Sequence, residues 1–136
     1  MSSGAVYQAL TNDPTLQTLC GGTDNFVFPD YAMESAPRDG VFLILRWGAQ
    51  DVTRAIRRGP VDLTVWAHQP KEDSTDYTLI NRVLNRARDV LEAIPDTPGP
   101  DSVRVNDVAF QGNGGNLYDP GFQTITKNSV YRVLLA

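Results

Sequence analysis

The clearest pattern of hydrophobic and polar positions runs from Gly59 to Pro95. Its first part alternates, and the apolar positions are Val61, Leu63, Val65 and Ala67. This two-residue period predicts a β-strand over residues 60–67 with one apolar face. Its second part repeats at steps of three and four residues, through Tyr77, Ile80, Leu84, Ala87, Leu91 and Ile94. That period predicts an amphipathic helix that packs on the strand, because neither apolar face can be left in water.

Residues at both ends of this helix predict its limits. Ser74 or Thr75 is a candidate N-cap, and Asp76 is expected in the first turn, where the helix dipole favours an anion. Pro95 is expected to end the helix, because proline cannot continue the backbone hydrogen-bond ladder.

The N-terminal residues predict two short helical segments. The apolar face of the first carries Val6, Ala9 and Leu10. Asp13 and Pro14 are expected to start the second, because aspartate caps a helix well and proline suits its first position. Gly21 and Gly22 are expected to end it.

Two apolar stretches before Gly59 predict strands. Residues 26–28 predict a short one, and the continuous apolar run at 41–45 predicts a central strand covered on both faces. We expect residues 41–47 and 60–67 to pair as a hairpin. Its long polar tip, Gly48 to Gly59, carries Arg54, Arg57 and Arg58.

The C-terminal part predicts two more strands. Val103 and Val105 have the opposite parity to Val108 and Phe110, so a β-bulge is expected at residues 106–107. Residues 112–121 are expected to form two turns. The final strand is expected to run through Val130, Tyr131, Val133 and Leu135.

Taken together, these elements predict a single α+β domain over residues 1–136. We expect a mostly antiparallel or mixed β-sheet, with a long helix and a short N-terminal helix packed on one face, plus a long extended hairpin. A chain of 136 residues is long enough to bury one substantial core.

Composition narrows the functional classes. The net charge of −4 argues against general binding to a phosphate backbone, because that affinity comes from Lys and Arg. The single cysteine, Cys20, excludes an internal disulfide, and we interpret it as a small buried apolar residue. The chain contains no apolar run long enough for a transmembrane helix, and residues 1–10 do not resemble a secretory signal.

Few residues in the sequence suggest a catalytic, metal or cofactor site. His68 is the only histidine and has no neighbouring metal-ligand motif, so we expect a structural histidine, with no metal, cofactor or catalytic site. Glu72, Asp73 and Asp76 form an acidic patch in the sequence; carboxylates before a helix start are more simply partners of its dipole than acid–base catalysts. The helix's polar side is expected to be a solvated face. Its charged residues are Arg82, Arg86, Asp89 and Glu92, with Arg86 and Asp89 as an i,i+3 pair.

Several stretches occur together in an order and spacing that resemble one known family. They are the N-terminal AVYQALTNDPTLQTLCGG, the strand VDLTVWAH with its acidic turn and long helix, and a late NLYDP turn before the last strand. Over nearly its full length, the chain resembles the tail terminator (tail-completion) proteins of long-tailed bacteriophages.

The resemblance implies a structural protein without enzymatic activity, in the virion at the head–tail junction, assembled in the host cytoplasm. Its subunits would form a homo-hexameric ring that caps the tail tube, stops its polymerisation and presents a surface to the head–tail connector. The implied partners are further copies, the tail tube protein and the connector protein. No cofactor, membrane or specific nucleic acid is implied, although DNA could pass through the ring.

Two alternatives remain open from the residues. One is a head-completion or neck connector protein of the head–tail junction. A more distant one is a small hydrolase that uses His68 with Asp73 or Asp76. For the ring, the candidate subunit or tube interface pairs basic with acidic residues of the next copy. Its members are Arg54, Arg57, Arg58, Glu72, Asp73 and Asp76.

Overall fold

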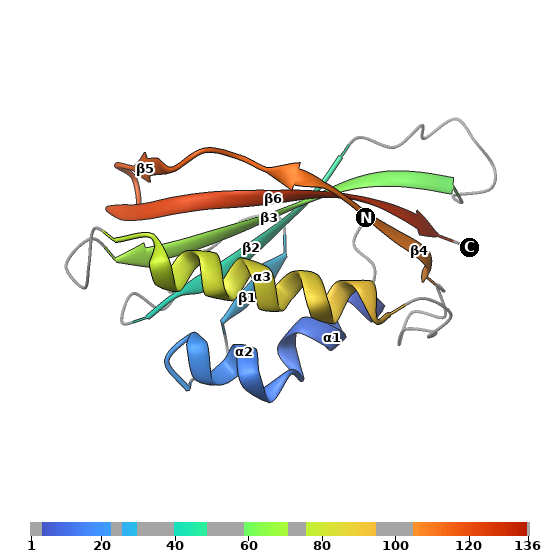
Figure 1. The fold of residues 1–136 in the computed structure, drawn as a ribbon, viewed down its shortest axis with the longest axis horizontal. Helices are drawn as coiled ribbons and strands as arrows, with labels where there is room; N and C mark the ends of the chain where they lie inside the picture. Colours follow the sequence, from blue (N-terminus) through green and yellow to red (C-terminus); the bar gives the residue numbers. More distant parts are fainter. Residues whose placement is uncertain are drawn as a thin grey trace.

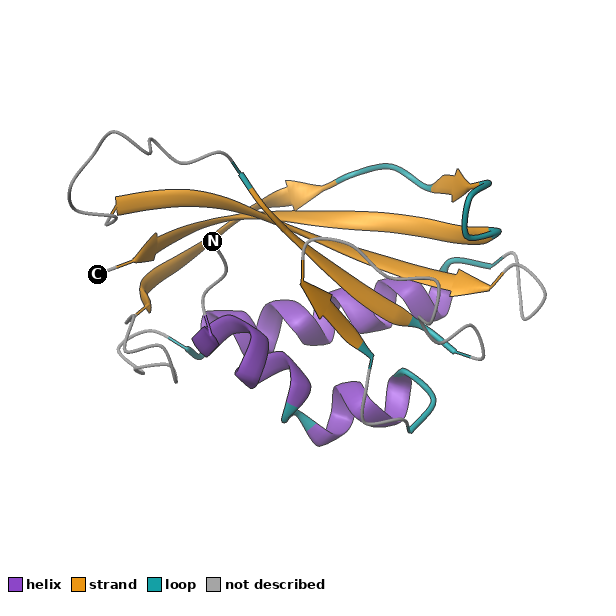
Figure 2. Ribbon diagram, turned by 180° about the vertical axis from the view of Figure 1, so that it is seen from behind, coloured by secondary structure: helices purple, strands orange, loops and turns teal. Residues whose placement is uncertain are grey.

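The computed structural model describes residues 4–22, 26–29, 40–48, 59–70, 76–94 and 105–135. These residues form three helices and six strands. The helices are α1 (Gly4–Thr11), α2 (Pro14–Leu19) and α3 (Thr78–Glu92). The strands are β1 (Val27–Pro29), β2 (Phe42–Trp47), β3 (Gly59–Pro70), β4 (Val105–Asn113), β5 (Leu117–Asp119) and β6 (Thr124–Leu135). All three helices lie on one side of the sheet (Figures 1 and 2), which confirms the predicted α+β class.

The sheet is built around the long pair β3 and β6. The strand order is β1-β2-β3-β6-β4, and β5 also pairs with β6. Only β1 and β2 are parallel; the other pairs are antiparallel. The β3–β6 register runs without a shift from Gly59 opposite Leu135 to Pro70 opposite Thr124. Because β3 and β4 are each antiparallel to β6, they run in the same direction, and α3 connects them across one face.

The predicted hairpin of β2 and β3 is confirmed, with Leu45 opposite Val65. As expected, β2 lies inside the sheet, between β1 and β3, although β1 pairs with it over only three residues. Its burial on both faces is confirmed, because Leu43 and Leu45 belong to the helix-covered core while Phe42 and Ile44 are buried on the other side. The predicted hairpin tip lies outside the described residues.

The predicted bulge in β4 is confirmed. The pairing of β4 with β6 shifts between Val105 and Asp107, where the parity of the apolar residues changes. A second shift, between Phe110 and Gly112, was not expected. Gly112 has a φ of 146°, a conformation that glycine adopts without a side-chain clash. Bulges of this kind disturb the outer edge of a sheet and discourage uncontrolled strand addition there.

The start of α3 differs from the expectation. The N-cap position is Tyr77, which makes no side-chain capping hydrogen bond, so Asp76 lies just before the helix instead of in its first turn. Asp76 Oδ1 accepts hydrogen bonds from the backbone N–H of Thr78 (3.0 Å) and from its hydroxyl (2.7 Å). Asp76 therefore satisfies an N-terminal N–H from outside the helix. The candidate caps Ser74 and Thr75 lie outside the described residues.

The apolar stripe of α3 fills the space above β3. Its buried members are Ile80, Val83, Leu84, Ala87 and Leu91. They belong to one core cluster with the inward positions of β3, which are Val61, Leu63, Val65 and Ala67. A polar link also joins the layers, where Lys127 Nζ of β6 donates to Asn81 Oδ1 of α3 at 2.9 Å. The predicted helix-on-sheet unit therefore forms the centre of the core.

Shortening one core leucine tests this packing. Leu84 is 3% exposed, and Leu84→Ala is expected to lower the free energy of unfolding by about 2–5 kcal/mol, through lost burial and the cavity left behind. Denaturant unfolding measures the change. Asn85→Ala, at an exposed neighbouring position of α3, is the matched control and should change stability by less than about 0.5 kcal/mol. Equal effects of the two changes would contradict the assigned face.

Candidate functional site: interaction surfaces

One predicted interface residue falls within the described part of the chain. Asp76 is exposed at the start of α3, and its hydrogen bonds from Thr78 lower the pKa of its carboxyl below the usual range. The other five lie outside the described residues: Arg54, Arg57, Arg58, Glu72 and Asp73. The structure therefore places one member of the predicted acidic patch at the end of the sheet where β3 stops and α3 begins (Figure 1).

Two large side chains of β5 are exposed. Leu117 and Tyr118 of β5 are 48% and 49% exposed, although large apolar side chains are usually buried. The hydroxyl of Tyr77 donates to the backbone oxygen of Leu117 at 2.6 Å, which joins the start of α3 to β5. We name Asp76, Tyr77, Leu117 and Tyr118 the β5 patch. Sequence reasoning placed residues 117–121 in a turn, because three strand residues are too few to show an alternating pattern.

A tight turn after β5 positions an aromatic ring. Asp119 Oδ1 accepts hydrogen bonds from the backbone N–H groups of Gly121 (2.8 Å) and Phe122 (3.2 Å). Through this turn, the Phe122 ring comes within 5.6 Å of Phe42 and 5.4 Å of His68, measured between ring centroids. Residues 119–122 therefore cover a part of the sheet that no helix covers.

His68 is buried in this aromatic cluster. Its ring is stacked on Phe42, with the centroids 5.0 Å apart and the planes inclined by 6°. Its Nδ1 lies 2.8 Å from Thr124 Oγ1, within hydrogen-bond distance. With only 4% of its surface exposed, His68 is a packed and hydrogen-bonded residue, as expected for a structural histidine. Among the described residues, no group of three His, Cys, Asp or Glu could hold a metal ion.

Burial also sets the protonation of His68 and Cys20. Loss of solvation lowers the pKa of His68 to about 4, and the charge of Asp119 opposes this only in part. Burial raises the pKa of the Cys20 thiol to about 12, so the thiol stays protonated at neutral pH. Cys20 is 2% exposed, which supports its interpretation as a small apolar core residue.

The buried histidine predicts a dependence of stability on pH. The unfolded chain binds the imidazole proton at an ordinary pKa of 6.5, whereas folded His68 binds it only near pH 4. Stability is therefore complete above about pH 6.5 and is lost as the pH falls towards 4, by roughly 3 kcal/mol. Unfolding of the wild type and of His68→Gln at several pH values measures this. The variant should lose this part of the dependence; an imidazole that titrates near 6.5 by NMR would contradict the argument.

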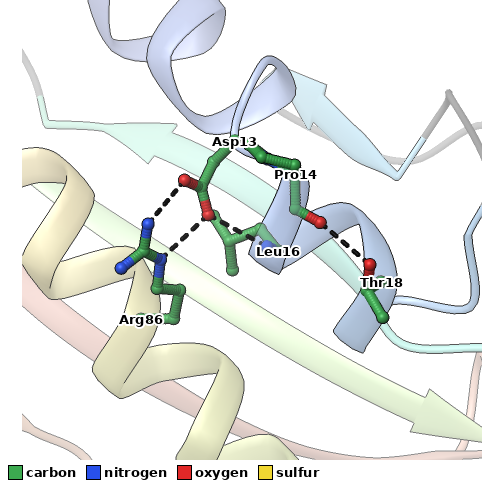
Figure 3. Close-up of polar contacts among 5 residues, drawn as sticks. All are labelled: Asp13, Pro14, Leu16, Thr18 and Arg86. Atoms are coloured by element: carbon green, nitrogen blue, oxygen red, sulfur yellow. Dashed lines mark hydrogen bonds and ion pairs between the residues drawn. The ribbon is translucent and has the colours of Figure 1, made fainter.

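A bidentate ion pair joins the N-terminal helices to α3 (Figure 3). Asp13 is the N-cap of α2, and its Oδ2 accepts from the backbone N–H of Leu16 at 2.9 Å. The same carboxylate accepts from Arg86 of α3, with Nε to Oδ2 at 3.0 Å and Nη2 to Oδ1 at 2.7 Å. The guanidinium lowers the pKa of the Asp13 carboxyl. One side chain therefore both caps α2 and ties it to α3.

This pair corrects the expectation that Arg86 lies on a solvated face with Asp89 as its partner. Arg86 reaches across to the α1–α2 connection, and Asp89 contributes only a minor charge effect. A pair 73 residues apart in the sequence cannot be recognised from local spacing. The only sequence signal was Asp13 itself, which was correctly predicted as a helix cap.

A shallow groove lies beside this ion pair, between α1 and α3. Its volume is about 460 Å³, and its lining residues are Ala5, Gln8, Ala9, Asn12, Asp13, Arg86, Asp89, Val90, Ala93 and Ile94. Small residues from both helices form one end, and the ion pair forms the other. Because Arg86 already uses two donors on Asp13, the polar end of the groove serves first to hold the helices together.

A double-mutant cycle tests the ion pair. Asp13→Ala removes the cap and the pair and is expected to cost about 1–3 kcal/mol of stability. Arg86→Ala removes only the pair, and the coupling energy between the two changes should be about 0.5–2 kcal/mol. Asp89→Ala is the control, because Asp89 makes only a minor charge contribution at Arg86. A coupling of Arg86 with Asp89 that exceeded its coupling with Asp13 would contradict the observed geometry.

Comparisons with known proteins find a likeness to a solved structure. No protein-family model matches the chain, and no curated protein matches it. Among solved structures, the fold is similar to that of a chain in the virion of a native gene transfer agent (GTA) particle, with a TM-score of 0.64 and 18% sequence identity. The match covers 96% of this chain and 90% of that chain. At this identity, the likeness establishes a shared fold.

Proposed function

We propose, starting from this shared fold, that the chain is a structural protein of a phage-like virion that acts as a tail terminator. In this role, copies of the chain form a ring, of six subunits by the family resemblance, that caps the tail tube and stops its polymerisation. The ring also provides the surface that joins the tail to the head–tail connector. The protein acts by assembly and carries out no catalysis.

The observation that carries this proposal is the likeness to a virion chain over nearly the whole length of both chains. A shared fold alone does not specify a function, because function resides in sites. The second support is therefore the order of the segments that resemble tail terminators. They form α1 and α2, the β3–α3 unit, and β5 with its following turn.

The surfaces of the described residues suit an assembly protein. His68 and Cys20 are both buried, so neither offers a reactive group to a substrate. The β5 patch, in contrast, exposes two large side chains at one end of the sheet, and exposed apolar residues of this kind are typical of protein–protein contacts. Within the described residues, no helix has the length and apolar character needed to cross a bilayer.

The test is the arrest of tube growth. Purified tail tube protein of the same particle is polymerised with and without this chain, and tube lengths are measured by electron microscopy. We expect shorter tubes that carry an added ring at one end. The folded variant Asn85→Ala should act as the wild type does, which controls for handling of the protein.

One result would overturn the terminator role, and a second measurement would then favour the alternative. Tubes of unchanged length, with no protein at their ends, would exclude capping of the tube. Binding to purified head–tail connector under the same conditions would then favour the neck connector, the alternative function at the same junction.

A further inference from the structure

The groove between α1 and α3 has two helical walls with the same spacing of lining residues. On α1, the lining residues lie three, four and seven positions after Ala5, and on α3 they lie three, four, seven and eight positions after Arg86. Residues at these spacings share one face of a helix. Figures 1 and 2 show α1 starting beside the C-terminal end of α3 and running back along it. Each helix therefore presents one continuous face to the groove.

The shape of the groove suits a helix. Ala5 and Ile94 are buried, Ala9 and Val90 are partly exposed, and Ala93 is exposed, so the apolar surface is accessible and lacks bulky side chains. Two helices that lie side by side leave a groove into which the side-chain ridges of a third helix can pack. A wall of seven residues is about 10 Å long, which corresponds to two turns of such a helix. A short amphipathic helix with apolar residues at helical spacing would fill the groove.

The charge of the groove is set by Asp89. It is exposed in the last turn of α3, and within the described residues no hydrogen bond or ion pair engages its carboxylate. The two other charged lining residues, Asp13 and Arg86, neutralise each other. The α1 wall contains no charged residue. The lining therefore has a net charge of −1.

The backbone of α3 adds to this negative charge. The C-terminal end of a helix is the negative end of its dipole, and a cation there is stabilising. The last turn of α3 contains no basic residue, and its other carboxylate, Glu92, is already paired with Arg88. Asp89 is thus in a position that the dipole disfavours, and local conflicts of this kind tend to occur at functional sites. A lysine or arginine of an occupant would relieve the conflict.

The α1 wall supplies neutral polar groups at the rim. Gln8 and Asn12 are exposed, one turn apart, and each side-chain amide can both donate and accept hydrogen bonds. The rim is therefore acidic on the α3 side and neutral on the α1 side. An occupant should place its basic residue over α3.

The described helices of a second copy do not have this chemistry. The sequences of α1, GAVYQALT, and α2, PTLQTL, contain no basic residue. The helix α3 contains arginines, but its apolar stripe is buried in its own core. The complementary helix therefore belongs to a different protein.

We propose that the groove between α1 and α3 is the docking site for a basic amphipathic helix of another protein. The apolar side chains of that helix lie on Ala5, Ala9 and Val90, and a lysine or arginine beside them pairs with Asp89 at the C-terminal end of α3. The site lies on the helix side of the sheet and does not require a ring. It goes beyond the proposed function, because it specifies the kind of partner that one surface binds.

The test uses synthetic peptides of about 18 residues, long enough to form a helix. One carries leucine at positions i, i+3, i+4 and i+7 of each pair of turns and lysine on its polar face; its partner peptide carries glutamate in place of lysine. Titration into the full chain is followed by NMR. We expect the basic peptide to bind at least about tenfold more tightly than the acidic one, and to shift the side-chain amide signals of Gln8 and Asn12.

Two variants and a control locate the contact. Asp89→Lys should weaken binding of the basic peptide at least about tenfold, without loss of stability, because the helix dipole favours the new cation. Asp107→Lys makes the same charge change at an exposed position of β4 and should alter binding by less than about twofold. Ala9→Phe narrows the groove and should also weaken binding. Thermal unfolding checks that this variant is folded; the two exposed aspartates decide the question if it is not.

Several outcomes would overturn the site. Equal weakening by Asp89→Lys and Asp107→Lys would show a general attraction between a basic peptide and an acidic chain. Unchanged binding to folded Ala9→Phe would place the peptide elsewhere. Preference for the acidic peptide, or no binding of the basic peptide by the wild type up to about 1 mM, would exclude the proposed occupant.

Discussion

The fold depends on one constraint: the apolar face of the β3–β6 pair must be covered, and α3 is the element that covers it. The buried stripe of α3 is continuous, and the strand beneath it presents an apolar side chain at every second position. Once α3 lies on that face, the crossover from β3 to β4 leaves room for β6 between them. The remaining helices then bury the rest of the face beside α3. Packing of this kind contributes most of the stability of an α+β domain.

The two sides of the sheet are stabilised in different ways. On the helix side, α1 and α2 are held by apolar contacts and by Asp13, which serves α2 as a cap and Arg86 as a partner. On the other side, an aromatic cluster around His68 covers one end, and the turn at Asp119 keeps Phe122 in place. Both arrangements use one carboxylate to satisfy several donors. Each links segments that are far apart in the sequence, which makes the domain cooperative.

The same architecture leaves the ends of the sheet for interaction. The long strands β3 and β6 separate the start of β3 from β5, which pairs with the other end of β6. Under the proposed function, the chain contacts its own copies, a tube and a connector, and separate ends of the sheet suit such contacts. The irregular outer strand β4, with its two bulges, suits this arrangement because it disfavours unspecific pairing along the sheet edge. Under the proposed function, the core holds these surfaces in place and takes no part in chemistry.

Much of this fold was determined by the sequence alone. Period-two and period-3.6 patterns are local, so β3, α3, the start of α2 at Asp13 and the bulge near Asn106 could all be predicted. The tertiary structure decided what no local pattern encodes. It paired Arg86 with Asp13 instead of Asp89, because side chains 73 residues apart meet only after α2 has packed on α3. It also turned residues 117–119 into a strand by pairing them with β6, and it joined this strand to Tyr77 at the start of α3, because the neighbours of an edge strand are set by sheet order and not by sequence.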